Sequence, residues 1–227
     1  MFGKLYIVAT PIGNLEDMTF RAVSTLSGVD AVLAEDTRVT GKLLKHFDIE
    51  NRLLSYHHHS KDERKLEILK LLIEGKNLAL VTDAGTPGIS DPGNELVDFL
   101  LDKEPKIEIV PIPGASSLTA ALSICGFDVS KFKFLGFLPK KGRSKLLSRL
   151  AKAKVAQVFF ESPNRLEKTL SELTEHLGEE RRVFVGRELT KMHEEVFRGK
   201  LGEVKENLSQ ANLKGEVVVV VEKNYSN

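Results

Sequence analysis

Four short apolar segments in the first half of the chain have the pattern of buried β-strands. They are rich in β-branched residues, are bounded by Gly, Pro, Asp or Thr, and cover residues 5–9, 31–34, 78–82 and 107–112. Apolar residues recur at helical spacing between and after them, at residues 17–26, 40–47, 61–74, 95–101 and 117–124. Strands that alternate with helices predict a parallel sheet covered by helices on both faces.

The pattern changes after residue 125. Residues 126–139 are irregular and rich in Phe and Lys, so we place a domain boundary at their start. Beyond them we predict strands at residues 155–160, 182–186 and 216–222 and helices at residues 143–153, 163–176 and 204–210. The sequence therefore predicts an α/β protein with two α/β domains, over residues 1–125 and a smaller one over residues 126–227.

Neither a membrane span nor an export signal is predicted. The longest strongly apolar run, Val217–Val221, is far shorter than the ~20 residues of a membrane span, and the apolar start of the chain is too short for a signal peptide. A single cysteine, Cys125, rules out an intramolecular disulfide and a Cys-rich zinc site. We expect a cytoplasmic protein without a membrane partner.

Charge is divided unequally along the chain. Residues 1–123 carry 13 Lys/Arg and 18 Asp/Glu, a net charge of −5, whereas residues 124–227 carry 20 and 14, a net charge of +6. Nine basic residues and no acidic residue lie between residues 131 and 154. An ordinary surface helix mixes both signs, so this segment is a candidate for binding a polyanion.

Several common nucleotide-binding and hydrolase signatures are absent from the sequence. No Gly-x-Gly-x-x-Gly follows the first predicted strand, no Gly-x-x-x-x-Gly-Lys-Ser/Thr occurs, and residues 114–118 lack the last glycine of a Gly-x-Ser-x-Gly elbow. Dehydrogenases, P-loop NTPases and α/β-hydrolases therefore become poor candidates.

Each predicted strand of the first half runs into a segment rich in Gly, Pro or small polar residues. These segments are residues 10–14 (TPIGN), 35–38 (EDTR), 83–93 (DAGTPGISDPG) and 113–117 (PGASS). Ligands of open α/β sheets bind beyond the carboxyl ends of the strands, so all four segments could line one cleft. The third has eleven residues, more than the ~2–6 usual for a βα connection, which is typical of a functional loop.

Two groups of titratable residues accompany these segments. Glu35, Asp36 and Arg38 put two carboxylates and a guanidinium at one strand end, which fits either a structural ion pair or a substrate site. Three consecutive histidines begin at His57, but adjacent side chains diverge and no second ligand cluster accompanies them. We therefore expect no metal site, and one imidazole near the cleft.

These segments form a specific combination with three later ones. The motifs are TPIGNL at residues 10–15, AEDTR at 34–38, TDAGTPGISDPG at 82–93, PGASS at 113–117, FESPNRL at 160–166, RELTK at 187–191 and KGE at 214–216. In this combination, which covers nearly the whole chain, the sequence resembles the ribosomal RNA small subunit methyltransferase I family of the tetrapyrrole methylase superfamily.

The resemblance implies a cofactor, a substrate and a set of site residues. It implies S-adenosylmethionine as methyl donor, held in a cleft between the two α/β domains of a homodimer, and 2′-O-methylation of a cytidine in the decoding region of 16S rRNA, free or in the 30S ribosomal subunit. The residues that it assigns to donor binding are Pro11, Asp83, Gly85, Thr86, Ile89, Ser116 and Ser117 in the first domain and Phe160, Glu161 and Gly215 in the second.

The chemistry of this reaction suggests further roles. A sulfonium methyl is already activated, so the protein must mainly align the ribose hydroxyl behind it, and a positioned base adds ~10²–10⁴-fold. Asp36 is the candidate base, with His57 next to test, and Glu35, Arg38 and His57 are expected to contact the substrate. In the basic segment we expect Lys140, Lys141 and Arg143 to bind rRNA phosphates, beside interleaved phenylalanines on which bases could stack.

Two other functions fit parts of the sequence. A tetrapyrrole (precorrin-type) or diphthine methyltransferase would share the donor pocket, but the run at residues 34–38 argues against both. A noncatalytic ribosome-associated RNA-binding module would share the basic segment, but the motif-rich strand ends argue against it.

Overall fold

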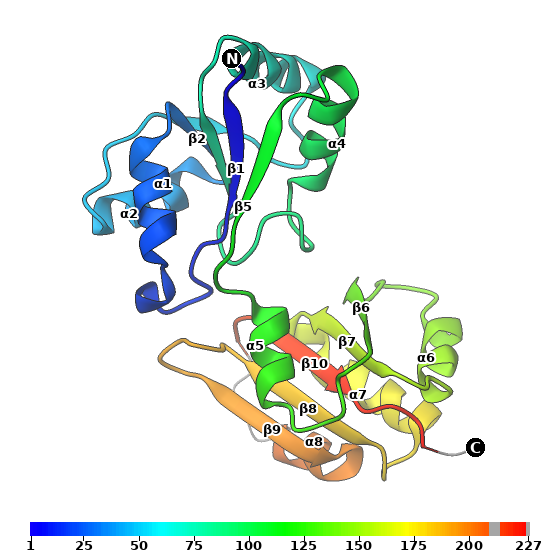
Figure 1. The fold of residues 1–227 in the computed structure, drawn as a ribbon. Coiled ribbons are helices and arrows are strands. Elements are labelled where there is room, and N and C mark those ends of the chain that lie inside the picture. The colour runs from blue at the N-terminus through cyan, green and yellow to red at the C-terminus, as the bar shows by residue number, and fades with distance from the viewer. Residues whose placement is uncertain (209–213, 226–227) are drawn as a thin grey trace. The chain divides into compact units, whose positions relative to one another are not determined.

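The computed structural model describes residues 1–208 and 214–225, and the chain divides into two compact units (Figure 1). The first unit is Met1–Ser116 and the second is Ser117–Asn227. The sequence pattern predicts the boundary between residues 125 and 126. The structure has it earlier because helix α5 (Ser117–Ile124) packs against strand β10 (Val217–Val221) of the second unit.

Five parallel strands form the sheet of the first unit, in the order β3-β2-β4-β1-β5. They are β1 (Lys4–Val8), β2 (Ala31–Ala34), β3 (Leu53–Ser55), β4 (Leu78–Val81) and β5 (Glu108–Ile112). The predicted parallel sheet is confirmed, and four of its strands match predicted segments. The sequence pattern misses β3, a three-residue edge strand that pairs only with β2.

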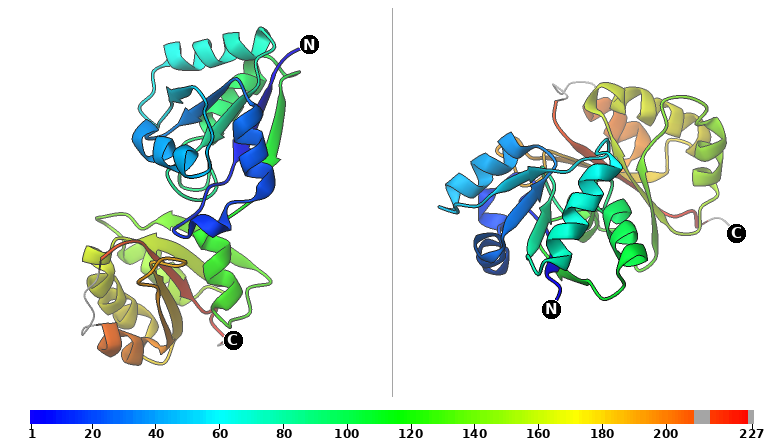
Figure 2. Two further views of the ribbon diagram at one scale, coloured as in Figure 1. Left: turned by 90° about the vertical axis from the view of Figure 1, so that its left-hand side faces the viewer. Right: turned by 90° about the horizontal axis from the view of Figure 1, so that it is seen from above.

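Helices cover both faces of this sheet, as Figures 1 and 2 show. They are α1 (Phe20–Gly28), α2 (Thr37–His46), α3 (Asp62–Ile73) and α4 (Asn94–Lys103). Successive residues of β4 face opposite sides: Leu78 and Leu80 pack in one core with α3 and α4, and Ala79 and Val81 in another with α1 and α2. Burial on both faces explains why the strands read as continuous apolar runs.

The helix predicted over residues 17–26 forms two elements. A short 3₁₀ helix, η1 (Leu15–Asp17), precedes α1. The Asn14 side chain accepts a hydrogen bond from the Glu16 N–H at 3.0 Å, and the Thr19 hydroxyl accepts one from the Ala22 N–H at 3.1 Å. Each side chain caps its own helix start, so the apolar spacing alone did not reveal the break.

The second unit has a mixed sheet in the order β6-β7-β10-β8-β9. Its strands are β6 (Phe132–Phe137), β7 (Ala156–Glu161), β8 (Arg182–Arg187), β9 (Glu195–Lys200) and β10. Only the β6–β7 pair is parallel. One face of the sheet packs against α6 (Ser144–Ala151), α7 (Pro163–Leu177) and α8 (Leu201–Leu208), and α5 lies on the other face (Figures 1 and 2).

The sequence pattern misses β6 and β9, the two edge strands of this sheet. β6 leaves most of its residues exposed or half-buried, and β9 alternates half-buried with exposed residues, so neither reads as an apolar run. Helix α8 begins at Leu201, earlier than predicted, and the last two residues of the predicted helix lie outside the described residues. In the described part of the chain, no helix has the length and apolar character to cross a membrane.

Candidate active site

The segments that follow the parallel strands of the first unit are joined by direct hydrogen bonds. Thr10, after β1, and Gly85, after β4, exchange two backbone hydrogen bonds of 2.9 and 3.1 Å. The Thr86 hydroxyl donates to the Ala115 carbonyl, after β5, at 3.1 Å. The expectation that these strand ends meet at one edge of the sheet is confirmed for these three segments.

Two glycines allow this close approach. Gly85 has φ +84, and a Cβ there would lie 3.3 Å from the Ile12 side chain. A Cβ on Gly114 would lie 3.0 Å from the Cβ of Ala9. Larger residues at either position would push the strand ends apart, so these glycines shape the backbone of the site.

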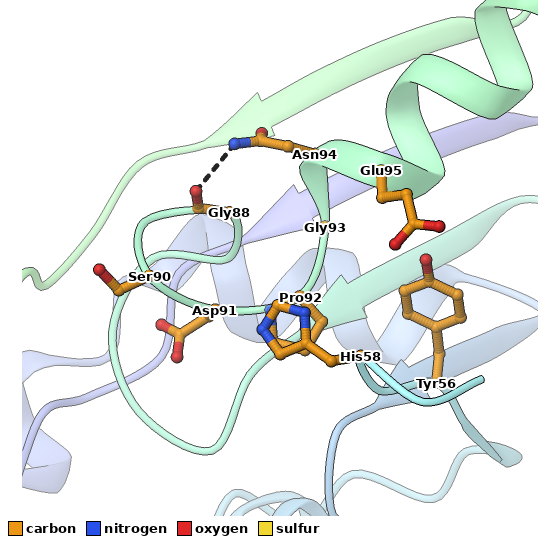
Figure 3. Close-up of a pocket in the computed structure, with 9 residues that line it drawn as sticks. All are labelled: Tyr56, His58, Gly88, Ser90, Asp91, Pro92, Gly93, Asn94 and Glu95. Carbon is orange, nitrogen blue, oxygen red and sulfur yellow. Dashed lines mark hydrogen bonds between the residues drawn. The ribbon is translucent and has the colours of Figure 1, made fainter. Parts of the chain in front are cut away.

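The long loop over residues 83–93 closes on itself. The Gly88 N–H donates to the Pro92 carbonyl at 3.2 Å, and the Asn94 side chain, at the start of α4, donates to the Gly88 carbonyl at 2.9 Å (Figure 3). Ser90, at the tip, has φ +66, a conformation rarely adopted by residues other than glycine. The loop therefore has a defined shape that its own contacts hold.

Three carboxylates gather where β2 and β4 end. The Asp36 N–H donates to the Asp83 carboxylate at 3.1 Å, and the Asp83 N–H donates to the Glu35 carboxylate. Burial raises the pKa of Glu35, and the negative charge of Asp83 raises it further. Partial burial also raises the pKa of Asp83. These two groups therefore bind protons more readily than ordinary carboxylates.

Asp36 has the opposite environment. Its carboxylate accepts hydrogen bonds from the Arg38 N–H at 2.8 Å and from the Arg38 guanidinium at 2.6 and 3.0 Å. The guanidinium and backbone hydrogen bonds lower the pKa of Asp36 to about 2. A carboxylate with so low a pKa is a very weak base, so this geometry argues against the role of base predicted for Asp36. It instead caps α2 and orients Arg38, whose side chain is 87% exposed.

His57, the second candidate base, is also engaged. Its Nδ1 accepts a hydrogen bond from the His59 N–H at 3.1 Å. One ring nitrogen is therefore already bonded within the histidine segment. Within residues 1–208 and 214–225, no group of three or more His, Cys, Asp or Glu side chains could hold a metal ion.

A cavity of about 410 Å³ lies beside the long loop (Figure 3). Its walls come from the residues that follow β3, the second half of the loop and the start of α4. They are Tyr56, His58, Gly88, Ser90, Asp91, Pro92, Gly93, Asn94 and Glu95. The sequence reasoning singled out the loop and the histidines but missed Tyr56 and Glu95, because the cavity forms only when β3 and α4 come together.

In the second unit, Arg143 is not on the surface, which corrects the expected phosphate contact. The side chain is 8% exposed and lies 3.3 Å from the Glu161 carboxylate and 2.5 Å from that of Glu172. Glu161, fully buried, also accepts hydrogen bonds from the Thr169 hydroxyl at 2.7 Å and the Arg165 guanidinium at 2.7 Å. The contacts of these two charged groups therefore join α6, β7 and α7. The Glu161 carboxylate has no open side left to contact the methyl donor.

Gly215 lies where two of the sequence motifs pack against each other. It has φ +89, and a Cβ there would lie 2.0 Å from the Glu188 carboxylate. That carboxylate accepts hydrogen bonds from the Glu216 N–H at 2.8 Å and from Lys191 at 2.9 Å. The segments at residues 187–191 and 214–216 therefore meet, and only glycine fits at this contact.

The other residues expected to bind ligands in this unit are accessible. Lys140 and Lys141 are exposed. Phe160 is half-buried and packs edge-on against Phe134 and Phe137, with ring centroids 4.9 and 5.5 Å away. Phe137 itself is 59% exposed. The second unit therefore has exposed ammonium groups and accessible aromatic rings.

A model of the family Tetrapyrrole (Corrin/Porphyrin) Methylases matches residues 4–205. The chain belongs to this family. It is 48% identical over 224 residues to a protein of Halalkalibacterium halodurans named ribosomal RNA small subunit methyltransferase I, covering 98% of this chain and 76% of that protein. A Thermotoga maritima protein of the same name is 50% identical over 220 residues, covering 96% and 98%.

Solved structures of tetrapyrrole methylases share the fold. Cobalt precorrin-4 methyltransferase has a TM-score of 0.72 at 20% identity, covering 96% of this chain and 94% of that one. The methyltransferase CobJ has a TM-score of 0.70 at 18% identity, covering 99% and 96%. The α/β fold class predicted from the sequence is thus confirmed.

As a tetrapyrrole methylase, the chain is a methyltransferase whose methyl donor is S-adenosylmethionine. Residues of the first unit fit this donor. Ile89, at the loop tip, offers an apolar side chain that is 41% exposed, and Asp83 offers a carboxylate to a cationic group. Gly85 is buried, and its N–H and carbonyl both pair with Thr10, so it shapes the site without facing the donor. The apolar surface and the carboxylate suit the adenine and the ammonium and sulfonium charges of the donor.

Proposed function

We propose that this tetrapyrrole methylase methylates the 2′-hydroxyl of a cytidine in the decoding region of 16S rRNA. The observation that carries the proposal is the 46–50% identity, over at least 96% of the chain, to proteins named ribosomal RNA small subunit methyltransferase I. The names of those relatives support small-subunit rRNA as the substrate class, and the motif resemblance supports the cytidine and its ribose 2′-oxygen as the target.

The substrate oxygen needs alignment and a proton acceptor. When bound, S-adenosylmethionine supplies an activated methyl group. We assign the acceptor role to Glu35, because its pKa is raised while Asp36 is held as a weak base by Arg38. The Glu35 carboxylate would accept the 2′-hydroxyl proton, and the bound donor would supply the methyl group to the ribose oxygen, its S–CH3 bond breaking so that it leaves as the neutral thioether. Arg38, largely exposed and oriented by Asp36, then fixes a neighbouring phosphate.

The second unit supplies the RNA contacts in this proposal. Eight of the nine basic residues between residues 131 and 154 are exposed, Arg143 being the buried one. Exposed basic side chains attract phosphates by their charge, and the aromatic rings around Phe160 offer surfaces on which bases can stack. The partner in this proposal is 16S rRNA, either free or in the 30S subunit. The proposal also includes a homodimer, and light scattering after gel filtration tests this oligomeric state.

Labelled methyl transfer tests the substrate class. Purified protein is incubated with methyl-labelled S-adenosylmethionine and, separately, with naked 16S rRNA, 30S subunits and a tetrapyrrole. The proposal expects label in 16S rRNA from one of the two RNA substrates and none in the tetrapyrrole. Label in the tetrapyrrole alone would contradict it and favour a precorrin-type activity. Donor binding without transfer to any RNA would also contradict it.

A further inference from the structure

The cavity beside the long loop has the size of a small-ligand site. Its volume of about 410 Å³ is within the ~300–1,000 Å³ typical of such sites and exceeds what one nucleobase needs. All nine lining residues belong to the first unit. The fold itself therefore forms a recess next to the three carboxylates.

One wall of the cavity carries a fixed hydrogen-bond acceptor. The Glu95 carboxylate is paired with Lys65, whose ammonium also lies 3.4 Å from Asp62. Lys65 is 7% exposed, whereas the Glu95 side chain is 67% exposed. The buried lysine thus holds the carboxylate in place while its outer face remains open. In base recognition, carboxylates accept hydrogen bonds from the exocyclic amine of cytosine.

Ring side chains line other parts of the cavity. Tyr56 is 3% exposed, and its hydroxyl points toward Glu95 (Figure 3). The ring of Pro92 is also buried, whereas the imidazole of His58 is exposed, so His58 is the aromatic side chain on which a base turned out of a helix can stack.

The cavity is connected to the proposed reaction centre by two residues. Tyr56 lines it and donates its backbone N–H to the carbonyl of Ala34, the residue before Glu35, at 2.8 Å. The loop that begins at Asp83, beside Glu35, forms the cavity wall from Gly88 onward. A base in the cavity would therefore leave its ribose close to the carboxylates.

We propose that this cavity receives the cytosine of the target nucleotide, with Glu95 accepting a hydrogen bond from the exocyclic amine. This inference rests on the proposed function and adds the device that selects the nucleotide. Uracil presents a carbonyl oxygen at the same position, which the Glu95 carboxylate would repel. Glu95 is a specificity residue in this account and does not touch the reacting atoms.

The test is a change of base preference. Single-turnover methylation is measured on 30S subunits assembled with 16S transcripts that carry either cytidine or uridine at the methylated position. Glu95→Gln keeps the shape of the side chain and adds an amide N–H, from which the carbonyl oxygen of uracil can accept a hydrogen bond. We expect its single-turnover rate on cytidine to fall by about 10-fold or more and its preference for cytidine over uridine to narrow by a similar factor. His58→Ala, a change at an exposed residue, should lower the single-turnover rate on both substrates.

Controls separate this role from loss of the fold or of the donor site. Asp98→Asn removes an exposed charge from the same helix outside the cavity and should leave both rates unchanged. Thermal melting checks that Glu95→Gln folds, and calorimetry with S-adenosylmethionine should give wild-type affinity for both cavity variants.

Unchanged base preference in Glu95→Gln, together with unchanged rates in His58→Ala, would overturn the inference while leaving the proposed function in place. Weakened donor binding in either variant would overturn it as well, because the cavity would then belong to the donor site. Failure of the wild-type protein to methylate either RNA would overturn the proposed function and this inference with it.

Discussion

Each unit contains an arginine paired with carboxylates, and the two pairs differ in burial. Arg38 is 87% exposed and holds Asp36 at the edge of the first unit, whereas Arg143 is 8% exposed and faces the fully buried Glu161 in the second. An exposed guanidinium can exchange its partner for a phosphate at little cost, while a buried one leaves an uncompensated charge when it moves. The exposed Arg38 is therefore a candidate substrate contact, whereas the buried Arg143 is part of the structure that holds its unit together.

The largest expected effect is the loss of the buried pair. Arg143→Ala would remove one of the two guanidinium groups paired with the buried Glu161 carboxylate, Arg165 being the other, and should reduce the free energy of unfolding by up to about 3–5 kcal/mol. Urea denaturation monitored by circular dichroism measures this. Lys140→Ala, three residues earlier and exposed, serves as the control and should unfold like the wild type. Equal stability of the two variants would break the comparison.

Next in size is the effect of removing the proposed base. Glu35→Gln should slow single-turnover methylation by about 100-fold at neutral pH, with donor affinity unchanged. The pKa of Glu35 lies above its ordinary value of 4.5, and the basic, ionised form is lost as the pH falls through it. The wild-type rate should therefore decline toward acid pH. A Glu35→Gln variant that keeps both the rate and the acid limb would assign the base elsewhere.

A smaller effect is expected at the exposed pair. Asp36→Asn keeps a good helix cap but loses the charge that orients Arg38, and Arg38→Ala removes the guanidinium itself. Both variants should lower single-turnover methylation by about 10-fold without weakening donor binding or stability. Normal methylation by both variants would make this pair structural despite its exposure.

The exposed lysines of the second unit should change the salt dependence of RNA binding. Replacing Lys140 and Lys141 by Ala should flatten the slope of log K against log salt for 30S binding by up to about 1.4–1.8 units, about 0.7–0.9 per phosphate contact. Lys70 and Lys103 are matched controls because they lie in the last turns of α3 and α4, at the end of the sheet opposite the site loops. Equal slopes in the two double variants would place the RNA contacts elsewhere.

The sequence predicted the fold where both faces of an element are buried or where a helix has one clear apolar face. It missed the edge strands β3, β6 and β9, since a strand with one neighbour and an exposed face need not be apolar. The sequence also indicated the loops that follow the strands of the first unit, because glycine and proline are common where the backbone turns. It did not predict the burial of Arg143, since Glu161 and Thr169 reach it only through the packing of α6 against α7.

The position of the added methyl group in 16S rRNA tests the proposed function most directly. After reaction of the wild-type protein with 30S subunits and S-adenosylmethionine, the rRNA is digested and its nucleosides and fragments are analysed by mass spectrometry. One added methyl is expected on the ribose of a cytidine within the decoding region, and with Glu35→Gln it should accumulate about 100-fold more slowly under the same conditions. A methyl on a base, on another nucleotide, or on no part of 16S rRNA would contradict it.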